Sequence, residues 1–496
     1  MKRRKYLLAC LLAGVTIAMP TGQLSFAAGA QNDISLMAES ESQSETQSES
    51  QSESETQSES QSESQSESES QSESESQSES ESEKESETET QDPNVPEGYK
   101  GIYKVSDLSL LSSKPDGKYM LMADLDLSSA EQASISVFRG TLDGNNHTIK
   151  GLKQALFQVL EEGTVSNLNL SSVQISGSGD AGALANVIGT GKKSAVTIQN
   201  ITITGSVTGT GNTGALAGVL KGTDVVISRI ANSATVAGTA NAGGLIGLVQ
   251  ATDEQEGAAS VKLTESYNIG EVSAVTAGGL IGAAEIPNLA AARNIEIANC
   301  YNAGVLEKGA NIVAKITAGN GQVVINKCVG IQFYYSVASG MVGTSTMAAG
   351  STQTSGCSIS NSYYYSMNPV YAFETGNCIT GTATALNDVQ IKTQSYFKDF
   401  DFNGIWALNA SENGGYPYLK QTTMLPVSYV APTAGTVLID SKTGGKYLVS
   451  TRSKAVSYAG VLDEEITSVS IPSQVEINGI TYNVTAIAEG ALRGNT

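Results

Sequence analysis

The chain has 496 residues, a formal net charge of −21, one His and one Trp. Its length allows one large and one small domain. The acidic balance and the lack of a basic stripe exclude nucleic acid as a partner. A single imidazole, His147, excludes the paired histidines of an HExxH zinc site, and nothing around it suggests the base of a Ser or Cys nucleophile.

Residues 1–30 have the features of a secretory signal peptide. Lys2–Lys5 form a basic start, Tyr6–Ala18 is apolar, and small residues follow that suit cleavage. The apolar stretch is shorter than the roughly 20 residues of a membrane-spanning helix, and Pro20 ends it. We therefore predict a bacterial protein that is secreted or held at the cell surface. An uncleaved membrane anchor is the alternative.

Residues 31–97 are predicted to be a disordered acidic stalk. From Glu39 to Gln91 the chain is almost entirely Ser, Glu, Gln and Thr, with no apolar residue to bury. This stretch holds 18 Glu and one Lys, so it carries 17 of the 21 net negative charges. Charge repulsion keeps such a segment extended, which suits a tether through a cell envelope. An inert soluble spacer fits the same composition.

Internal repeats predict the architecture of residues 98–423. Four glycine-rich segments recur at spacings of 32, 29 and 35 residues: AGALANVI from 181, TGALAGVL from 213, AGGLIGLV from 242 and AGGLIGAA from 277. A β-branched segment follows each one, and no helical periodicity appears. A unit of about 30 residues cannot bury its own apolar face, so the copies must stack. The predicted fold class is all-β, a parallel β-helix.

The glycine motifs resemble a known family. Gly244–Gly247 and Gly279–Gly282 are similar to the GLUG repeat of Gram-positive surface proteins and of the N-terminal β-helix of immunoglobulin-cleaving metalloproteases. FRGTLDGNNHTIKGL at 138–152 resembles the first turn of such domains, and residues 397–419, here named the closing segment, resemble their end. The resemblance covers about 98–420 and implies an adhesin, a spacer or an accessory β-helix.

A different pattern follows a short linker at 424–436. Residues 437–496 resemble the start of a BspA-type leucine-rich repeat array, in which Asn478-Gly479 predicts a β-hairpin turn. Only about one unit is present, whereas a solenoid normally needs three or more. The unit is therefore either a cap or the front of a longer product, and we favour the second interpretation.

Candidate chemistry in the repeats is sparse. Clustered carboxylates would allow a polysaccharide-degrading β-helix enzyme. However, the acids fall at different points of the repeat alignment: Asp180, Asp224, Glu265, Glu271 and Glu296. Asp124, Asp126 and the segment 143–146 carry oxygen ligands of the kind that Ca²⁺ prefers, but beside glycine such residues usually form turns. We therefore predict no enzymatic activity, no catalytic residue, no cofactor and no metal.

Four cysteines remain after removal of the signal peptide: Cys300, Cys328, Cys357 and Cys378. An even number in an exported chain allows disulfides. Their spacings of 28, 29 and 21 residues also suit stacking on successive turns as small apolar residues. We favour buried thiols, with one or two incidental bridges as the alternative.

Tyrosines supply the predicted contact surface, because exposed aromatic rings offer large rigid area at low entropic cost. The candidates are Tyr334, Tyr335, Tyr363, Tyr364, Tyr365 and Tyr371. Strand alternation sends some of these rings inward.

We predict a monomeric adhesin or binding module whose partner is an extracellular protein or glycan, with the cell envelope as a further contact. A non-binding spacer is the alternative; a concave or aromatic patch would favour binding, and a uniformly polar surface would favour the spacer.

Overall fold

The computed structural model describes residues 92–493 apart from 133–134, 192–193, 251–258, 289–291, 307, 333–336, 367–377, 411, 424–434, 436, 441, 450–454, 463–467 and 478–479. The predicted signal peptide and the stalk up to residue 91 lie outside the described residues, as does the predicted linker apart from Gly435. Residues 92–97, predicted as the end of the stalk, instead form turns in which Val95 is buried.

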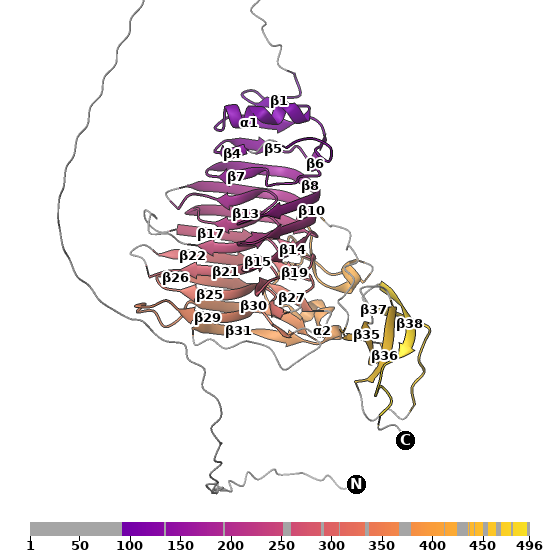
Figure 1. Ribbon diagram of the computed structural model, residues 1–496. Helices are drawn as coiled ribbons and strands as arrows, with labels where there is room; N and C mark the ends of the chain where they lie inside the picture. The colour runs from indigo at the N-terminus through magenta and orange to yellow at the C-terminus, as the bar shows by residue number, and fades with distance from the viewer. Residues whose placement is uncertain are drawn as a thin grey trace, which may run out of the picture. The chain divides into compact units, whose positions relative to one another are not determined.

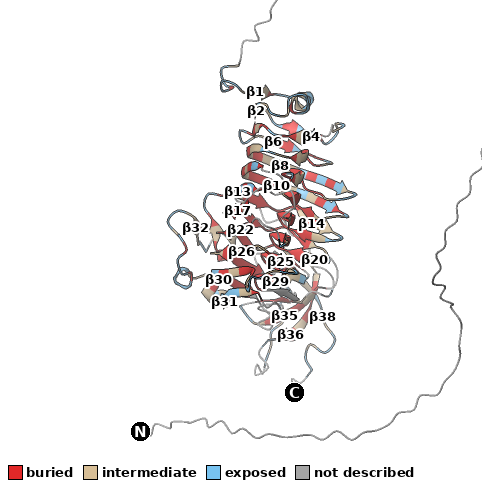
Figure 2. Cartoon of the chain, turned by 90° about the vertical axis from the view of Figure 1, so that its left-hand side faces the viewer, coloured by how far each residue is buried: buried red, intermediate tan, exposed pale blue. Residues whose placement is uncertain are grey.

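The large domain is a parallel β-helix, as predicted. Its turns stack along the domain axis, so strands from one turn pair in parallel with those of the next (Figure 1). Three sheets form its sides, with the apolar core enclosed between them (Figure 2). No helix among the described residues is long and apolar enough to span a membrane.

Among the described residues, the largest sheet, sheet A, has 18 strands. They are β1 Lys100–Ile102, β2 Lys118–Leu121, β3 Leu125–Asp126, β5 Thr141–Asp143, β6 Thr148–Lys150, β8 Gly163–Gly177, β10 Ala195–Gly209, β13 Asp224–Asn232, β14 Thr235–Gly238, β17 Ala259–Thr264, β18 Tyr267–Asn268, β19 Val272–Ser273, β22 Arg293–Ala298, β23 Tyr301–Asn302, β26 Gly321–Asn326, β27 Val329–Gln332, β30 Cys357–Ser366 and β31 Ile379–Leu386.

Two smaller sheets complete the turns. Sheet B contains β4 Ile135–Phe138, β7 Phe157–Leu160, β9 Ala185–Ile188, β12 Ala217–Leu220, β16 Ile246–Gln250, β21 Ile281–Ile286, β25 Val313–Ala318 and β29 Val342–Met347. Sheet C contains β11 Thr213–Gly214, β15 Asn241–Gly243, β20 Thr276–Gly278, β24 Lys308–Ala310 and β28 Val337–Ser339.

The glycine repeat corresponds to one turn of the β-helix. Gly214 pairs with Gly243, and Gly243 pairs with Gly278, so the repeat spacing places equivalent glycines on neighbouring strands of sheet C. A side chain on Gly243 or Gly278 would collide with backbone of its own turn, at Ile246 and Ile281 respectively. The corner between sheets C and B therefore requires residues without a Cβ atom.

A second feature recurs once per turn in sheet A. One residue of each turn has a positive φ of 44–56° and interrupts the extended strand: Asn167, Asn200, Arg229, Glu265, Asn299, Lys327 and Asn361. Asparagine tolerates this left-handed conformation better than most residues, which explains its frequency here. The interruption divides sheet A into two halves with differently exposed outer faces.

A row of asparagines lies buried inside the stack. The Nδ2 atoms of Asn232, Asn268 and Asn302 donate to the side-chain oxygens of Asn268, Asn302 and Asn311 at 2.8, 2.9 and 3.0 Å. The oxygens of Asn232, Asn268 and Asn302 also accept the backbone N–H two residues ahead. We call this row of four residues the internal asparagine ladder. Buried amides whose donors and acceptors all have hydrogen-bond partners fix the register between turns.

Short helices lie near the two ends of the domain. The 3-10 helix η1 Val105–Leu108 and helix α1 Ser109–Ser113 lie near the first turn, where Leu111 is buried. Helix α2 Asp388–Ile391, 3-10 helix η2 Gln394–Tyr396, strand β32 Trp406–Ala407, 3-10 helix η3 Asn413–Gly415 and strand β33 Tyr418–Leu419 follow the last turn.

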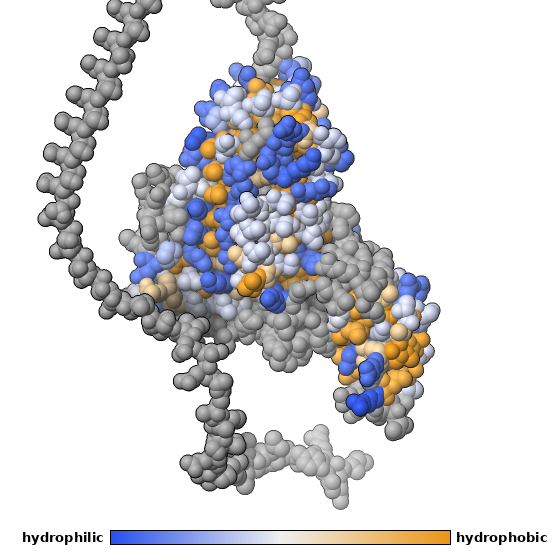
Figure 3. All heavy atoms as spheres, viewed as in Figure 1, coloured by the Kyte–Doolittle hydropathy of each residue, from blue (hydrophilic) through white to orange (hydrophobic). Residues whose placement is uncertain are grey.

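The C-terminal unit is a small mixed sheet with its own core. Its strands are β34 Val437–Ile439, β35 Gly445–Val449, β36 Ala455–Val461, β37 Gln474–Ile477 and β38 Ile480–Ile487. β37 and β38 pair antiparallel across Ile477 and Ile480, which is the predicted hairpin, although the turn residues lie outside the described part of the chain. Apolar side chains gather on this unit in Figure 3. Leu462, Ile487 and Leu492 of the unit are exposed.

Candidate binding surface

The predicted tyrosine surface is wrong for the three tyrosines of β30. Tyr363, Tyr364 and Tyr365 are only 5–6% exposed, so their rings are not available to a ligand. Tyr364 packs into the main core, whereas Tyr363 and Tyr365 belong to a second apolar cluster on the other face of the sheet. The remaining candidates, Tyr334, Tyr335 and Tyr371, lie outside the described residues.

The closing segment covers the outward-facing tyrosines. Tyr363 makes edge contacts with Phe397 and Phe400 at ring distances of 5.0 and 5.6 Å, and its hydroxyl accepts the backbone N–H of Lys398 at 2.7 Å. Tyr365 packs against Tyr416 at 6.1 Å. The outward side of β30 carries Tyr363 and Tyr365, and a later part of the chain buries them there.

The same cover extends over earlier turns. Tyr267 and Tyr301 stack with ring centroids 4.7 Å apart, and Trp406 packs on Tyr301 at 6.2 Å. The Trp406 Nε1 donates to Asn299 Oδ1 at 3.2 Å, and the Tyr267 hydroxyl donates to the carbonyl of Thr423 at 2.8 Å. This half of sheet A is therefore an internal interface rather than a ligand surface.

The oxygen-rich segments 124–126 and 143–146 form hydrogen bonds within and between neighbouring turns. Asp124 accepts the backbone N–H of Thr148 and contacts His147 Nδ1 at 3.1 Å. These interactions, the Thr148 hydrogen bond first, lower the pKa of the Asp124 carboxyl. Asp126 pairs with Lys150 at 2.9 Å, and Asp143 accepts from Asn145 and Asn167. Asn145 and Asn146 form a turn, as we interpreted them, whereas Asp126 lies in β3 and Asp143 lies at the end of β5.

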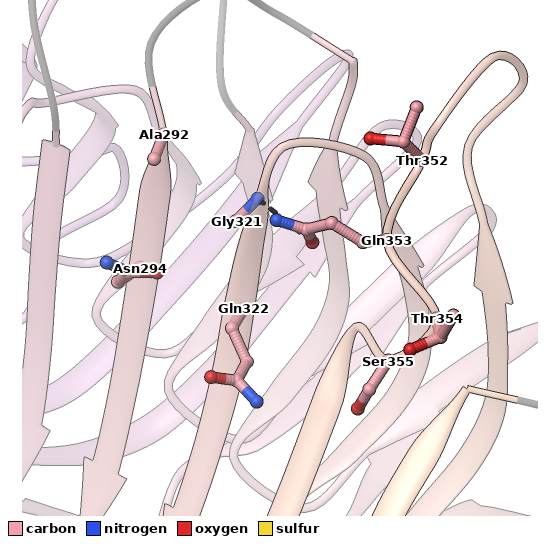
Figure 4. Close-up of a pocket in the computed structure, with 8 residues that line it drawn as sticks. All are labelled: Ala292, Asn294, Gly321, Gln322, Thr352, Gln353, Thr354 and Ser355. Carbon is pink, nitrogen blue, oxygen red and sulfur yellow. Dashed lines mark hydrogen bonds between the residues drawn. The ribbon is translucent and has the colours of Figure 1, made fainter.

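A shallow depression lies on the uncovered half of sheet A. It has a volume of about 410 Å³, within the roughly 300–1,000 Å³ of small-molecule sites. The ends of β22 and β26 and the loop between β29 and β30 form it, through Ala292, Asn294, Gly321, Gln322 and residues 352–355 (Figure 4). We call it the amide depression.

Several polar groups of the amide depression have unused hydrogen-bonding capacity. Asn294 and Gln322 are register partners on adjacent strands. Within the described part of the chain, no hydrogen bond engages their side chains or those of Thr352 and Thr354. In the internal asparagine ladder, by contrast, stacked amides bond to one another. The amides of the depression are thus open to solvent and to a ligand.

The loop that forms one side of the depression is anchored by its other polar side chains. The Gln353 Nε2 donates to the carbonyl oxygens of Gly319 and Gly321 at 3.0 Å. The Ser355 hydroxyl donates to the carbonyls of Cys357 and Cys378 at 3.1 and 3.3 Å. These bonds hold Thr352 and Thr354 beside the strand ends without using their hydroxyls.

The surroundings of the depression are close to neutral. No charged side chain lines it among the described residues. The neighbouring outward row carries exposed Lys262 and Glu296 side by side on β17 and β22, one charge of each sign. Hydrophilic and weakly polar side chains cover most of the β-helix in the view of Figure 3. The candidate surface is therefore polar, uncharged and concave.

The four cysteines are free, buried thiols, which agrees with the favoured prediction. Burial raises the pKa of Cys357 to about 12 from 9.0, so the folded state disfavours its thiolate. We expect negligible labelling of all four by iodoacetamide at pH 8 in the folded protein, and full labelling in denaturant, measured by peptide mass spectrometry. Rapid labelling of Cys357 in the folded protein would contradict this.

The raised pKa of Cys357 makes the stability of the fold depend on pH. Because the folded pKa of Cys357 lies above the unfolded value, its contribution is fully present below about pH 9 and is lost as pH rises toward 12. Burial also raises the pKa of Tyr301 and Tyr365 in the same direction. We expect the urea midpoint to fall steadily above pH 9, and a flat profile up to pH 11 would contradict the burial of these groups.

Part of the β-helix is similar in sequence to known proteins. Residues 99–205 match the family described as the M26 IgA1-specific metallo-endopeptidase N-terminal region. An immunoglobulin A1 protease of Streptococcus sanguinis is 34% identical over 116 residues, which is 21% of this chain and 6% of that protein. Halomucin of Haloquadratum walsbyi is 32% identical over 124 residues, 20% of this chain and 1% of that protein. The chain thus covers only a small fraction of its curated relatives.

Solved structures give a weaker likeness. A crystal structure provisionally assigned as an immunoglobulin A1 protease from Bacteroides ovatus is 19% identical. It aligns over 65% of this chain and 92% of its own, with a TM-score of 0.40. The similarity to this family supports the general part of the predicted localisation, a location outside the cell.

These matches contradict our prediction that the protein has no enzymatic role. The matching family is described as a metallo-endopeptidase, and relatives are named as proteases. The prediction rested on titratable side chains, whereas the relationship is carried by the repeating β scaffold of residues 99–205. A scaffold of apolar rows and glycine corners contains no catalytic signature that a residue search would find.

The described residues do not fit the metal that a metallo-endopeptidase uses. No group of three His, Cys, Asp or Glu side chains among them could hold an ion. The one histidine contacts Asp124 in the first turn, and the four cysteines are buried in the core. We therefore derive no step through a metal.

Proposed function

We propose that this β-helix is the substrate-binding region of an immunoglobulin A1 protease-like protein outside the cell. The observation that carries the proposal is the match of residues 99–205 to the N-terminal region of that protease family. The β-helix would capture an immunoglobulin-type glycoprotein and hold it for cleavage. The adhesion that we predicted from the sequence is then capture of a soluble host protein.

The surface supports binding over a purely structural role. The spacer alternative calls for a uniformly polar outside, and the outer face of sheet A is polar, but it also carries a concave site with unused amides, which favours binding. That face is formed by central strands, which hold the depression rigidly. Sites on rigid elements lose little entropy when they bind.

The finer assignments from the sequence remain part of this proposal. The paired glycines of neighbouring turns support the GLUG repeat, because they occupy equivalent corners. The C-terminal sheet supports a leucine-rich repeat start only through its short strands and its hairpin. A signal peptide in residues 1–30 would deliver the chain to its substrate.

Binding to immunoglobulin A1 tests the proposal. We expect the purified chain to bind immobilised immunoglobulin A1 saturably, with a Kd of roughly micromolar or tighter, as ordinary protein interfaces do. Immunoglobulin G, presented in the same way, is the matched control and should bind at least about tenfold more weakly, a difference of one decade in Kd. Equal affinity for both, or no binding by a folded chain, would reject the proposal.

A further inference from the structure

We propose that the amide depression is a binding site for a neutral glycan carried by the glycoprotein that the β-helix captures. This inference rests on the proposed function and names the part of the substrate that the site contacts. The depression combines the amides of Asn294 and Gln322 with the hydroxyls of Thr352 and Thr354, none of which has a hydrogen-bond partner among the described residues.

The chemistry of these groups matches a sugar. An amide side chain offers two N–H donors and an acceptor oxygen, and a hydroxyl offers both roles. Sugar hydroxyls likewise donate and accept, so each can pair with one amide or hydroxyl of the depression. Asn294 and Gln322 lie on neighbouring strands, which are about 4.8 Å apart, so both can reach one saccharide unit.

The uncharged lining of the depression favours neutral glycans over anionic ones. An anionic sugar would need a cationic partner, because a carboxylate loses water on entry and must be compensated. The lining contains no Lys or Arg among the described residues, and nearby Lys262 is balanced by Glu296. A neutral saccharide is therefore the ligand that this lining accepts without an unpaired charge.

A peptide fits the depression less well. Strands β22 and β26 are paired on both sides, so their backbone groups are already used and cannot add a peptide strand. Protein partners also require apolar or aromatic anchors at the centre of the contact. Ala292 is the single apolar side chain in the lining.

A glycan array probed with the purified chain tests the inference. We expect binding to neutral oligosaccharides and weaker binding to their sialylated forms. The double variant Asn294→Ala/Gln322→Ala should bind about tenfold more weakly, because it removes the two amides and leaves the fold intact. The matched control, Thr197→Ala/Gln199→Ala, alters the same outer face on β10 and should bind like the wild type.

Enzymatically deglycosylated immunoglobulin A1 separates this inference from the proposed function. We expect glycan removal and the Asn294→Ala/Gln322→Ala change each to weaken binding of the immunoglobulin, and to have no additive effect together. If the chain binds deglycosylated immunoglobulin A1 as well as the intact protein and binds no glycan on the array, the glycan site is overturned and the proposed function is not. If the chain binds neutral glycans but does not bind immunoglobulin A1, the proposed function is rejected instead. Binding confined to bacterial cell-wall polysaccharide would overturn the assignment to a glycoprotein.

Discussion

Trp406→Ala is expected to lower the free energy of unfolding by about 3–5 kcal/mol, the usual cost of removing a fully buried large aromatic ring. Trp406 is completely buried, packs against Phe400 at 4.9 Å and against Tyr301 at 6.2 Å, and bonds Asn299 through Nε1. The substitution would open a cavity between the closing segment and sheet A. Urea unfolding followed by far-ultraviolet circular dichroism measures the loss.

The conservative variant Trp406→Phe separates packing from hydrogen bonding. It keeps most of the apolar contact and removes the Nε1 bond to Asn299, so we expect a loss of about 1–2 kcal/mol. Trp406 is the chain's one tryptophan, so its fluorescence in the wild type reports directly on the closing segment. Emission at the wavelength of exposed tryptophan in the folded protein, or a loss below about 1 kcal/mol for Trp406→Ala, would contradict the packing described here.

The fold was predictable because its signal is repetitive. The glycines at 214, 243 and 278 are one turn apart in both sequence and structure. A spacing of about 30 residues, combined with short apolar runs, leaves few ways to bury a core other than stacking. The asparagine of each turn in RIANSATV, ESYNIGEV and NCYNAGVL also aligns, and these residues form three rungs of the internal asparagine ladder.

The burial of the tyrosines was not predictable from periodicity. Alternation in β30 places Tyr364 on one face and Tyr363 and Tyr365 on the other, but it does not say what lies against either face. The cover comes from Phe397 and Phe400, more than 30 residues later. Such long-range packing depends on the path of the chain after the last turn, which local patterns do not encode.

The amide depression escaped sequence reasoning for a related reason. Asn294 and Gln322 belong to adjacent turns and become neighbours only through the register of β22 and β26. The third part of the lining is a loop of variable length between turns, residues 352–355. Asparagine and threonine also occur often in turns, so nothing marks these positions until the stack brings them together.

The internal asparagine ladder yields the second large prediction. Asn268→Ala should lower the free energy of unfolding by about 4 kcal/mol or prevent folding, because four buried hydrogen bonds disappear at once. Asn268 accepts from Gly270 N–H and from Asn232, and it donates to Gly270 O and to Asn302. Its removal leaves each of these groups unpaired in a site without solvent access, at a cost of about 1–3 kcal/mol apiece before relaxation.

Two further variants make the ladder prediction specific. Asn241→Ala removes a single amide bond, to Asn212 at 2.8 Å, in a half-buried position, and should cost less than about 1.5 kcal/mol. Asn268→Asp keeps the acceptor roles but donates only when protonated, so burial should raise its folded pKa above the unfolded value of about 3.9. Its stability should then be greatest at low pH and fall as pH rises, the reverse of an exposed paired carboxyl. Urea midpoints measured from pH 4 to pH 8 test both expectations. If the stability of Asn268→Asp does not depend on pH, or if Asn268→Ala and Asn241→Ala lose equal free energy of unfolding, the internal amides do not hold the turns in register.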